Sequence, residues 1–320
     1  MVSRREFLYY SAGTVAAASV TGAAHAMAPM LGAKPANIQR YKFGGFELTA
    51  IRDGQVTLDK PQSVFGTDQT VENVANFSKR YFLPTDKHVL QFTPVVVNTG
   101  KELVLIDTGW GSGNPGRGEL AGSLKAAGYT ADQFDVVILS HCHPDHMGGL
   151  MDGDKPVFPN ARYVMGEGEY NFWTNPNQST GGTADFYKLT KAKVSPLAPK
   201  MTFVKDQGTA VSGITAISTP GHTPGHTSWR LESSGKQMIV TADTCNHATL
   251  SMEHPKWHVL FDMDKAKATK TRLKMLDMLA HDRIPFTGYH MPFPAVGFVE
   301  KHVSPELYYH YEPATYQFML

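Results

Sequence analysis

The chain has 320 residues, a formal net charge of +1 at pH 7 and 18% charged residues. This near-neutral balance gives no basic footprint for nucleic acid and no acidic tail. The 29 glycines and 20 prolines are spread between apolar segments without a repeat, which excludes low-complexity and repeat proteins and indicates an ordinary globular chain.

The first residues resemble an export signal. Residues 3–8 contain the arginine pair of the bacterial twin-arginine motif, and a weakly apolar, Ala-rich stretch follows. Residues 24–26 have the small-x-small pattern that signal peptidase cleaves. We therefore expect a twin-arginine signal peptide at residues 1–26, export by the twin-arginine translocase to the periplasm or the extracellular space, and one mature domain at residues 27–320. A short membrane anchor is the alternative, although a spanning helix needs about 20 apolar residues.

The N-terminal part of the mature chain begins with a predicted hairpin. Two alternating runs at residues 38–43 and 46–52 flank Gly44 and Gly45. Residues 60–92 have weak periodicity, and we expect only a loop or short helices there, near the rim of the domain.

The middle of the chain contains buried strands. Runs dense in Val, Leu and Ile predict strands at residues 94–99, 103–107 and 136–140. A helix is expected before the third strand, because Leu120, Leu124 and Ala127 fall on one helical face and Gly128 can end it.

The C-terminal half alternates strands and helices. Strands are predicted at residues 162–165, 201–204, 214–218, 227–232 and 237–242. Helices are predicted at residues 167–174 and after Asp264, with a mobile insert at residues 175–200 and a final strand, histidine and Pro-rich turn within residues 284–300. This order is typical of an α/β fold with two packed sheets and outer helices, a four-layer αββα sandwich.

Residues 141–146, His-Cys-His-Pro-Asp-His, bring three imidazoles and a carboxylate together directly after a buried strand. These groups suit zinc or a similar divalent ion. Alternate residues of an extended segment face the same way, so His141 and His143 can bind one ion. Pro144 then redirects the chain and lets Asp145 and His146 face a second ion. The spacing disfavours the alternative of a polar loop with coincidental histidines.

This segment resembles the HxHxDH motif of the metallo-β-lactamase superfamily. Three further features match that superfamily in order: Asp-Thr-Gly at residues 107–109, Thr-Pro-Gly-His at residues 219–222 and Thr-Ala-Asp at residues 241–243. His290 fits the last histidine of the pattern, and the resemblance covers about residues 38–301.

The resemblance implies two divalent metal ions per chain, with zinc expected and manganese, cobalt or iron as alternatives. It assigns to the first ion His141, His143 and His222, to the second Asp145, His146 and His290, and to both Asp243. Asp107 would fix a histidine ring by hydrogen bonding rather than touch an ion; a plain turn aspartate is its alternative. His226 repeats the Gly-His pattern and is expected to be structural, while His281 and His302 are alternatives to His290.

Two such ions indicate hydrolysis. A water shared by two divalent ions has a pKa that can fall from about 15.7 toward about 7, which makes a bridging hydroxide available at neutral pH. We expect it to cleave an ester, lactone or phosphotriester bond of a small molecule, with Asp145 or Asp243 relaying a proton to the leaving group.

Within the superfamily, the chain resembles exported methyl parathion hydrolases and lactonases. The first resemblance implies that Trp173 lines an aromatic pocket for an apolar leaving group; a core tryptophan on a short helix is the alternative. Acyl-homoserine lactonases share every ligand, but many have a tyrosine three residues after the bridging aspartate, where this chain has Asn246.

Other interpretations stay open. They are a quorum-quenching lactonase, a β-lactamase-type hydrolase and, from another class, a non-catalytic exported binding protein that holds its metals for structure. Relatives are often dimers, which favours a homodimer. Cys142 and Cys245 are too few for a disulfide scaffold and are expected to pack in the core, with a thiol near the metals or one disulfide as alternatives.

Overall fold

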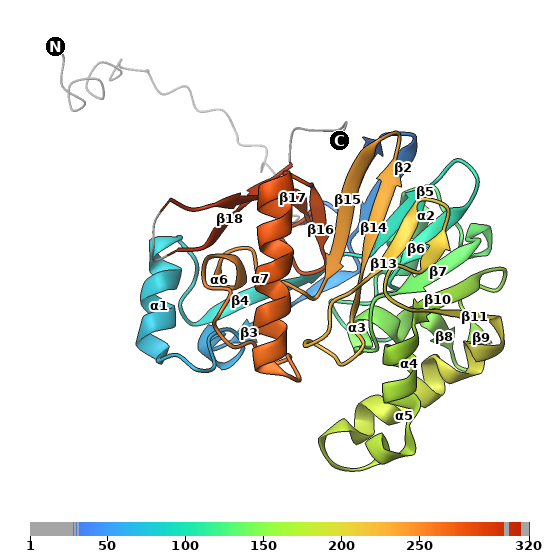
Figure 1. The fold of residues 1–320 in the computed structure, drawn as a ribbon, viewed down its shortest axis with the longest axis horizontal. Coiled ribbons are helices and arrows are strands. Elements are labelled where there is room, and N and C mark those ends of the chain that lie inside the picture. The colour runs from blue at the N-terminus through green and yellow to red at the C-terminus, as the bar shows by residue number, and fades with distance from the viewer. Residues whose placement is uncertain (1–27, 29, 31, 304–306, 315–319) are drawn as a thin grey trace, which may run out of the picture. The chain divides into compact units, whose positions relative to one another are not determined.

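The computed structural model describes residues 28, 30, 32–303, 307–314 and 320 (Figure 1). Residues Ala36–Leu320 form one compact unit, which contains every element given below. The expected signal peptide at residues 1–26 lies outside the described residues, so it stays a prediction. Among the residues described, no helix combines the length and apolar character needed to cross a membrane.

Two seven-stranded sheets form the inner layers (Figure 1). The first has the order β1 (Ile38–Phe43), β2 (Phe46–Ile51), β5 (Val95–Asn98), β6 (Leu103–Ile106), β7 (Val136–Leu139), β10 (Arg162–Gly166) and β11 (Met201–Val204). The second has the order β12 (Thr209–Val211), β13 (Ile214–Ser218), β14 (Thr227–Ser233), β15 (Lys236–Ala242), β16 (Phe286–Gly288), β17 (Val296–Lys301) and β18 (Tyr309–Pro313). Apolar side chains of both sheets meet in one core, as Ile138 and Trp229 do.

Helices cover the outer faces of both sheets. A second core joins the first sheet to α2 (Leu120–Ala126), α4 (Glu167–Thr174) and α5 (Ala184–Lys193). A third core joins the second sheet to α7 (Lys265–Asp282), whose N-cap Asp264 accepts a hydrogen bond from the backbone N–H of Lys267. The predicted αββα sandwich is therefore confirmed.

Several predicted elements agree with the structure to within a residue or two. The β1–β2 hairpin turns at Gly44, whose φ of 55° lies in the left-handed region that glycine adopts without strain. Short elements also lie between the main strands and helices: η3 (Ala131–Gln133), α3 (Pro144–Met147), η4 (Gly148–Leu150), β8 (Met151–Asp152), β9 (Lys155–Pro156) and α6 (Leu250–Glu253).

The prediction of a loop or short helices for residues 60–92 was wrong in one important part. Besides η2 (Pro61–Ser63) and α1 (Val71–Arg80), this stretch contains β4 (Lys87–Phe92), which pairs antiparallel with β3 (Gly54–Asp59). Burial alternates along β4 because every second side chain faces the same side of the two-stranded sheet. The alternation of apolar and polar residues along β4 is visible in the sequence. It is too short to predict a strand without β3, the strand with which it pairs.

The expected mobile insert at residues 175–200 is instead built of helices. It contains η5 (Pro176–Ser179), η6 (Gly181–Thr183), α5 and η7 (Ser195–Lys200). Val194 and Leu197 are buried in the core beneath the first sheet. These contacts, rather than a strong helical period, hold the segment in place.

Candidate metal centre

The proposed metal ligands lie where strands of both sheets end. His141 follows β7 by two residues, Asp243 follows β15 directly, and His290 follows β16 by two residues. The pair β6–β7 in the first sheet and the pair β15–β16 in the second are each parallel. Within each pair, the carboxyl ends of the two strands therefore lie at the same edge of the sheet. Ligand clusters at that edge are common in α/β folds.

The first cluster contains His141, His143, His222 and Asp243, whose candidate ligand atoms all lie within 4.8 Å of one another. Nε2 of His222 is 2.9 Å from Nδ1 of His143 and 3.2 Å from Oδ2 of Asp243. If both imidazole nitrogens are unprotonated they repel at this distance, and a cation between them would satisfy both.

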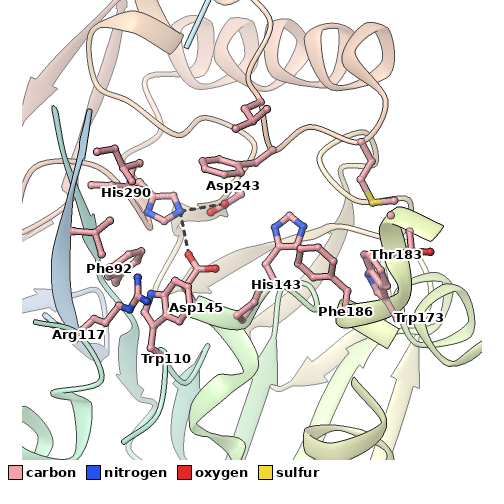
Figure 2. Close-up of a pocket in the computed structure, with 18 residues that line it drawn as sticks. Phe92, Trp110, Arg117, His143, Asp145, Trp173, Thr183, Phe186, Asp243 and His290 are labelled. Carbon is pink, nitrogen blue, oxygen red and sulfur yellow. Dashed lines mark hydrogen bonds and ion pairs between the residues drawn. The ribbon is translucent and has the colours of Figure 1, made fainter. Parts of the chain in front are cut away.

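The second cluster contains Asp145, His146 and His290. Oδ2 of Asp145 is 3.5 Å from Nε2 of His146 and 3.5 Å from Nε2 of His290. Asp243 faces this cluster too, with Oδ1 3.3 Å from Nε2 of His146 and Oδ2 3.1 Å from Nε2 of His290. Its carboxylate therefore lies between the two clusters (Figure 2).

Orphaned polar atoms test whether this donor set fits two cations. Nε2 of His141, Nε2 of His146 and Oδ1 of Asp243 are buried and have no hydrogen-bond partner in the described part of the chain. Leaving such a group unsatisfied costs about 1–3 kcal/mol each. All three atoms belong to the two ligand sets, so the residues present fit two divalent ions.

Electrostatics favour an ionised Asp243. Burial alone would raise its pKa, but His290, His146 and His222 hold the pKa of this carboxyl well below its usual range. A carboxylate ion with two free oxygens can serve two cations about 3.5–4 Å apart.

In four of the ligand histidines, Nε2 faces the ligand cluster and Nδ1 contacts a polar atom of the surrounding protein. The contacts are His141 Nδ1 to Ser140 Oγ at 3.0 Å, His146 Nδ1 to Asp107 Oδ2 at 2.8 Å, His222 Nδ1 to Asp262 Oδ1 at 3.0 Å, and His290 Nδ1 to the Gln91 carbonyl at 2.8 Å. Such contacts fix ring orientation and leave Nε2 to face an ion. Asp107 thus makes the kind of contact that the sequence predicted for it. The roles of Asp262 and Gln91 were missed.

The competing histidines lie outside these two clusters. His226 Nε2 accepts a hydrogen bond from the Asp243 backbone N–H at 3.2 Å, and its Nδ1 lies 2.8 Å from Thr219 Oγ1. Burial lowers the pKa of His226 to about 3, so its ring is neutral. His281 is exposed on α7, and His302 belongs to a separate group.

Glu169 is a buried residue that the sequence analysis missed. Its Oε1 accepts hydrogen bonds from the Cys142 backbone N–H at 2.9 Å and from Trp173 Nε1 at 2.7 Å. Its Oε2 accepts from Thr223 Oγ1 at 2.7 Å and from the Gly225 backbone N–H at 3.0 Å. The carboxylate therefore ties together the two loops that contain ligands of the first cluster. The i,i+4 spacing of Glu169 and Trp173 on α4 was the one signal available in the sequence.

A mostly apolar cavity of about 450 Å³ opens over the metal centre (Figure 2). Four candidate metal ligands line it: His143, Asp145, Asp243 and His290. Arg117 and Thr183 are also polar, and the other lining residues are Val56, Leu58, Leu90, Phe92, Trp110, Pro144, Trp173, Gly182, Phe186, Leu260, Phe261 and Met263. The two segments of uncertain role, residues 60–92 and 175–200, thus supply parts of its wall.

Trp173 lies both in the core and at the cavity wall. Its side chain is buried in the core beneath the first sheet, and one surface of it lines the cavity next to Phe186. Because its indole N–H is bound to Glu169, the ring offers the cavity an apolar surface.

The two cysteines are unpaired and buried. Cys142 lies in the core under the first sheet and Cys245 in the core under α7. Burial raises the pKa of both thiols, that of Cys245 to about 12. They pack as apolar residues and form no disulfide with each other.

Known proteins share this fold and sequence pattern. Residues 92–287, more than half of the chain, match the model of the metallo-beta-lactamase superfamily. N-acyl homoserine lactonase AttM of Agrobacterium fabrum is 32% identical over 138 residues, which are 41% of this chain and 47% of that protein; the chain thus spans about half the length of this relative. The probable metallo-hydrolase YflN of Bacillus subtilis is 26% identical over 275 residues, covering 75% of this chain and 91% of that protein.

Solved structures extend the similarity to the whole domain. AidC, a dizinc quorum-quenching lactonase, is 28% identical with a TM-score of 0.80 and covers 88% of this chain and 98% of its own. The hydrolase AbOPH is 27% identical with a TM-score of 0.80 and covers 89% of this chain and 99% of its own. With its fold, its ordered motifs and its family match in agreement, the chain belongs to the metallo-beta-lactamase superfamily.

Proposed function

We propose that the protein is a hydrolase that holds two divalent ions, with zinc as the expected metal, and cleaves a small lactone or carboxylic ester. The observation that carries this proposal is the pair of ligand clusters that share Asp243 at an apolar cavity. The similarity to a dizinc lactonase over 88% of the chain supports it.

The positions of the side chains suggest which of them would bind each ion. His141, His143 and His222 would hold one ion, Asp145, His146 and His290 the other, and Asp243 both. Two divalent ions at these positions would lower the pKa of a shared water and polarise the substrate oxygen under attack.

Proton transfer to the leaving group favours Asp145 over Asp243. Both carboxylates line the cavity, but Asp243 Oδ2 already meets His222, His290 and the Asn246 amide at 3.0–3.2 Å. The Asp145 side chain is the more exposed of the two, at 13% against 4%. Asp145 can therefore reach a leaving group without giving up as many contacts.

The cavity wall indicates the apolar character of the substrate. Trp173 and Phe186 line one part of it, and Leu90 and Phe92 of β4 line another. Burying an acyl or aryl group there contributes about 25 cal/mol per Å² of apolar surface. We propose that this group positions the bond to be cleaved over the metal centre.

A phosphotriester or aryl ester is the second candidate, because of Asn246. Its amide donates to Asp243 Oδ2 at 3.0 Å and the side chain is buried, so it is not among the residues that line the cavity. The tyrosine that many lactonases place at this position is absent. Substrates with a good leaving group need no such hydroxyl.

The test is a metal assay joined to an activity panel on the full chain. The panel contains N-hexanoyl homoserine lactone, p-nitrophenyl butyrate and diethyl p-nitrophenyl phosphate. We expect at least two ions per chain, and turnover that a chelator removes and zinc restores. Bound ions without turnover would favour the non-catalytic binding protein, and a chain that takes up no stoichiometric metal would refute both.

Export by the twin-arginine route is part of the proposal. It rests on the arginine pair and the cleavage pattern of residues 1–26. N-terminal sequencing of protein recovered from the periplasm is expected to begin near Met27. A chain that keeps its N-terminus in the cytoplasm would contradict it.

A further inference from the structure

A third group of candidate ligands shares no residue with the metal centre. It consists of Glu253 at the end of α6, His302 directly after β17, and His310 on β18. Each offers one ligand atom, and the three atoms lie within 4.8 Å of one another.

The distances within this group match ligands around a shared ion. Nε2 of His302 is 3.3 Å from Oε2 of Glu253, and Nδ1 of His310 is 3.5 Å from Oε1. A tetrahedral zinc ion with bonds of about 2.0–2.1 Å separates its ligand atoms by about 3.3–3.4 Å. A direct charged hydrogen bond would be shorter, about 2.7–2.9 Å. His302 Nε2 is also buried without a hydrogen-bond partner among the described residues.

The burial of the Glu253 carboxylate also favours a bound cation. Its side chain is 1% exposed, and within residues 32–303 and 307–314 no lysine or arginine forms an ion pair with it. Its one other side-chain partner there is Tyr81, whose hydroxyl donates a hydrogen bond to Oε2. Buried carboxylates are normally paired with a cation or bound to a metal.

The backbone holds the three residues in place before any ion binds. The Tyr308 N–H donates to the Glu253 carbonyl at 3.2 Å, and the His302 N–H donates to the Tyr308 carbonyl at 3.0 Å. The β17–β18 register places His310 opposite Glu300. The side chains of His302 and His310 are 26% and 44% exposed, so an ion and a water can enter from solvent.

We propose that Glu253, His302 and His310 bind one further divalent cation of the zinc type, with water completing the coordination. The ion links α6 to the β17–β18 hairpin. Because this site exists only in the folded chain, binding stabilises the fold. The inference does not depend on the proposed function.

The experiment counts ions in the full chain after loading with zinc and desalting. The unmodified protein is expected to hold three ions per chain and His310→Ala two. His281→Ala is the matched control, since His281 is an exposed histidine on α7 beside Asp282, and it should keep three. The rise in Tm on adding zinc should be smaller in His310→Ala than in His281→Ala.

Two further variants guard against partial effects. The double variant His302→Ala/His310→Ala removes both imidazoles, so that two remaining ligands cannot mask the loss. Glu253→Gln keeps the shape of the side chain and should also lose one ion. Equal ion counts in the unmodified protein and the double variant would overturn the inference and show an ordinary Glu-His ion pair.

The ion counts also separate this inference from the proposed function. Two ions in both the unmodified protein and the double variant would refute the third site and leave the Asp243 centre intact. One ion that the double variant loses would support the third site and refute the two-ion centre.

Discussion

The Asp243 centre and the Glu253 site use the same kinds of side chain in different surroundings. In the Asp243 centre the ligand residues are buried, and four histidines are anchored through the ring nitrogen that faces away from the ligand cluster. In the Glu253 site the histidines are partly exposed, and within the described chain no acceptor is found for a second ring nitrogen. Anchoring partners typically change metal affinity by about 10- to 100-fold.

The difference in burial and anchoring suits the two sites to different roles. A buried, anchored centre would hold its ions and keep their ligands in one orientation while a substrate reacts. A partly exposed site, in which no described residue anchors the second ring nitrogens, would exchange its ion with solvent and would serve stability. We therefore expect chelators to remove the Glu253 ion first.

The largest expected effect is a loss of catalytic activity when the Asp243 centre is changed but not when the Glu253 site is changed. Asp243→Asn should lower kcat/KM by about 10³-fold or more, because it takes away the carboxylate charge between the two clusters. His310→Ala should stay within about twofold of the unmodified protein. Steady-state kinetics on the best panel substrate measures both, with Asp154→Asn, an exposed turn residue, as the control. Similar losses in the Asp243 and His310 variants would break the comparison.

The next effect tests the anchoring itself. Asp107→Asn leaves His146 Nδ1 without its carboxylate and should weaken metal affinity about 10- to 100-fold while the chain stays folded. Competition with a chelator, followed by metal analysis and circular dichroism, measures it. An unchanged affinity would mean that anchoring does not distinguish the centre from the Glu253 site.

A smaller effect is expected from the carboxylate that joins two ligand loops. In Glu169→Gln an amide NH₂ must face N–H or O–H donors, which costs about 1–3 kcal/mol of unfolding free energy. We expect a lower Tm and a kcat reduced about 10-fold. Glu167→Gln is the control on the same helix, because the Glu167 side chain is 45% exposed and, among the described residues, forms an ion pair only with the exposed Lys205. A variant that lost stability with unchanged kcat would limit Glu169 to a structural role.

The smallest effect concerns the cavity wall. Trp173→Phe keeps an aromatic ring but removes part of the apolar surface and the hydrogen bond to Glu169, so KM should rise about 2- to 10-fold for substrates with an apolar group. Trp229→Phe is the matched control, because Trp229 is buried between the sheets and does not line the cavity. Equal changes in KM would argue against a pocket role.

The sequence alone determined what depends on local spacing. Residues 141–146 follow a buried strand with alternating histidines, so their meeting could be predicted from strand geometry. The β1–β2 hairpin followed from two adjacent glycines between alternating runs. The resemblance to a known superfamily then supplied the more distant ligands His222, Asp243 and His290.

Contacts between remote segments follow from tertiary packing and could not be predicted from the sequence. Asp262 lies 40 residues from His222 in the chain and Gln91 lies 199 from His290, and no local pattern pairs them. Glu253 and its two histidines come together because α6 packs on a β17–β18 hairpin that forms far along the chain. Local periodicity reports which face of one element is buried, whereas packing of whole elements decides which buried faces meet.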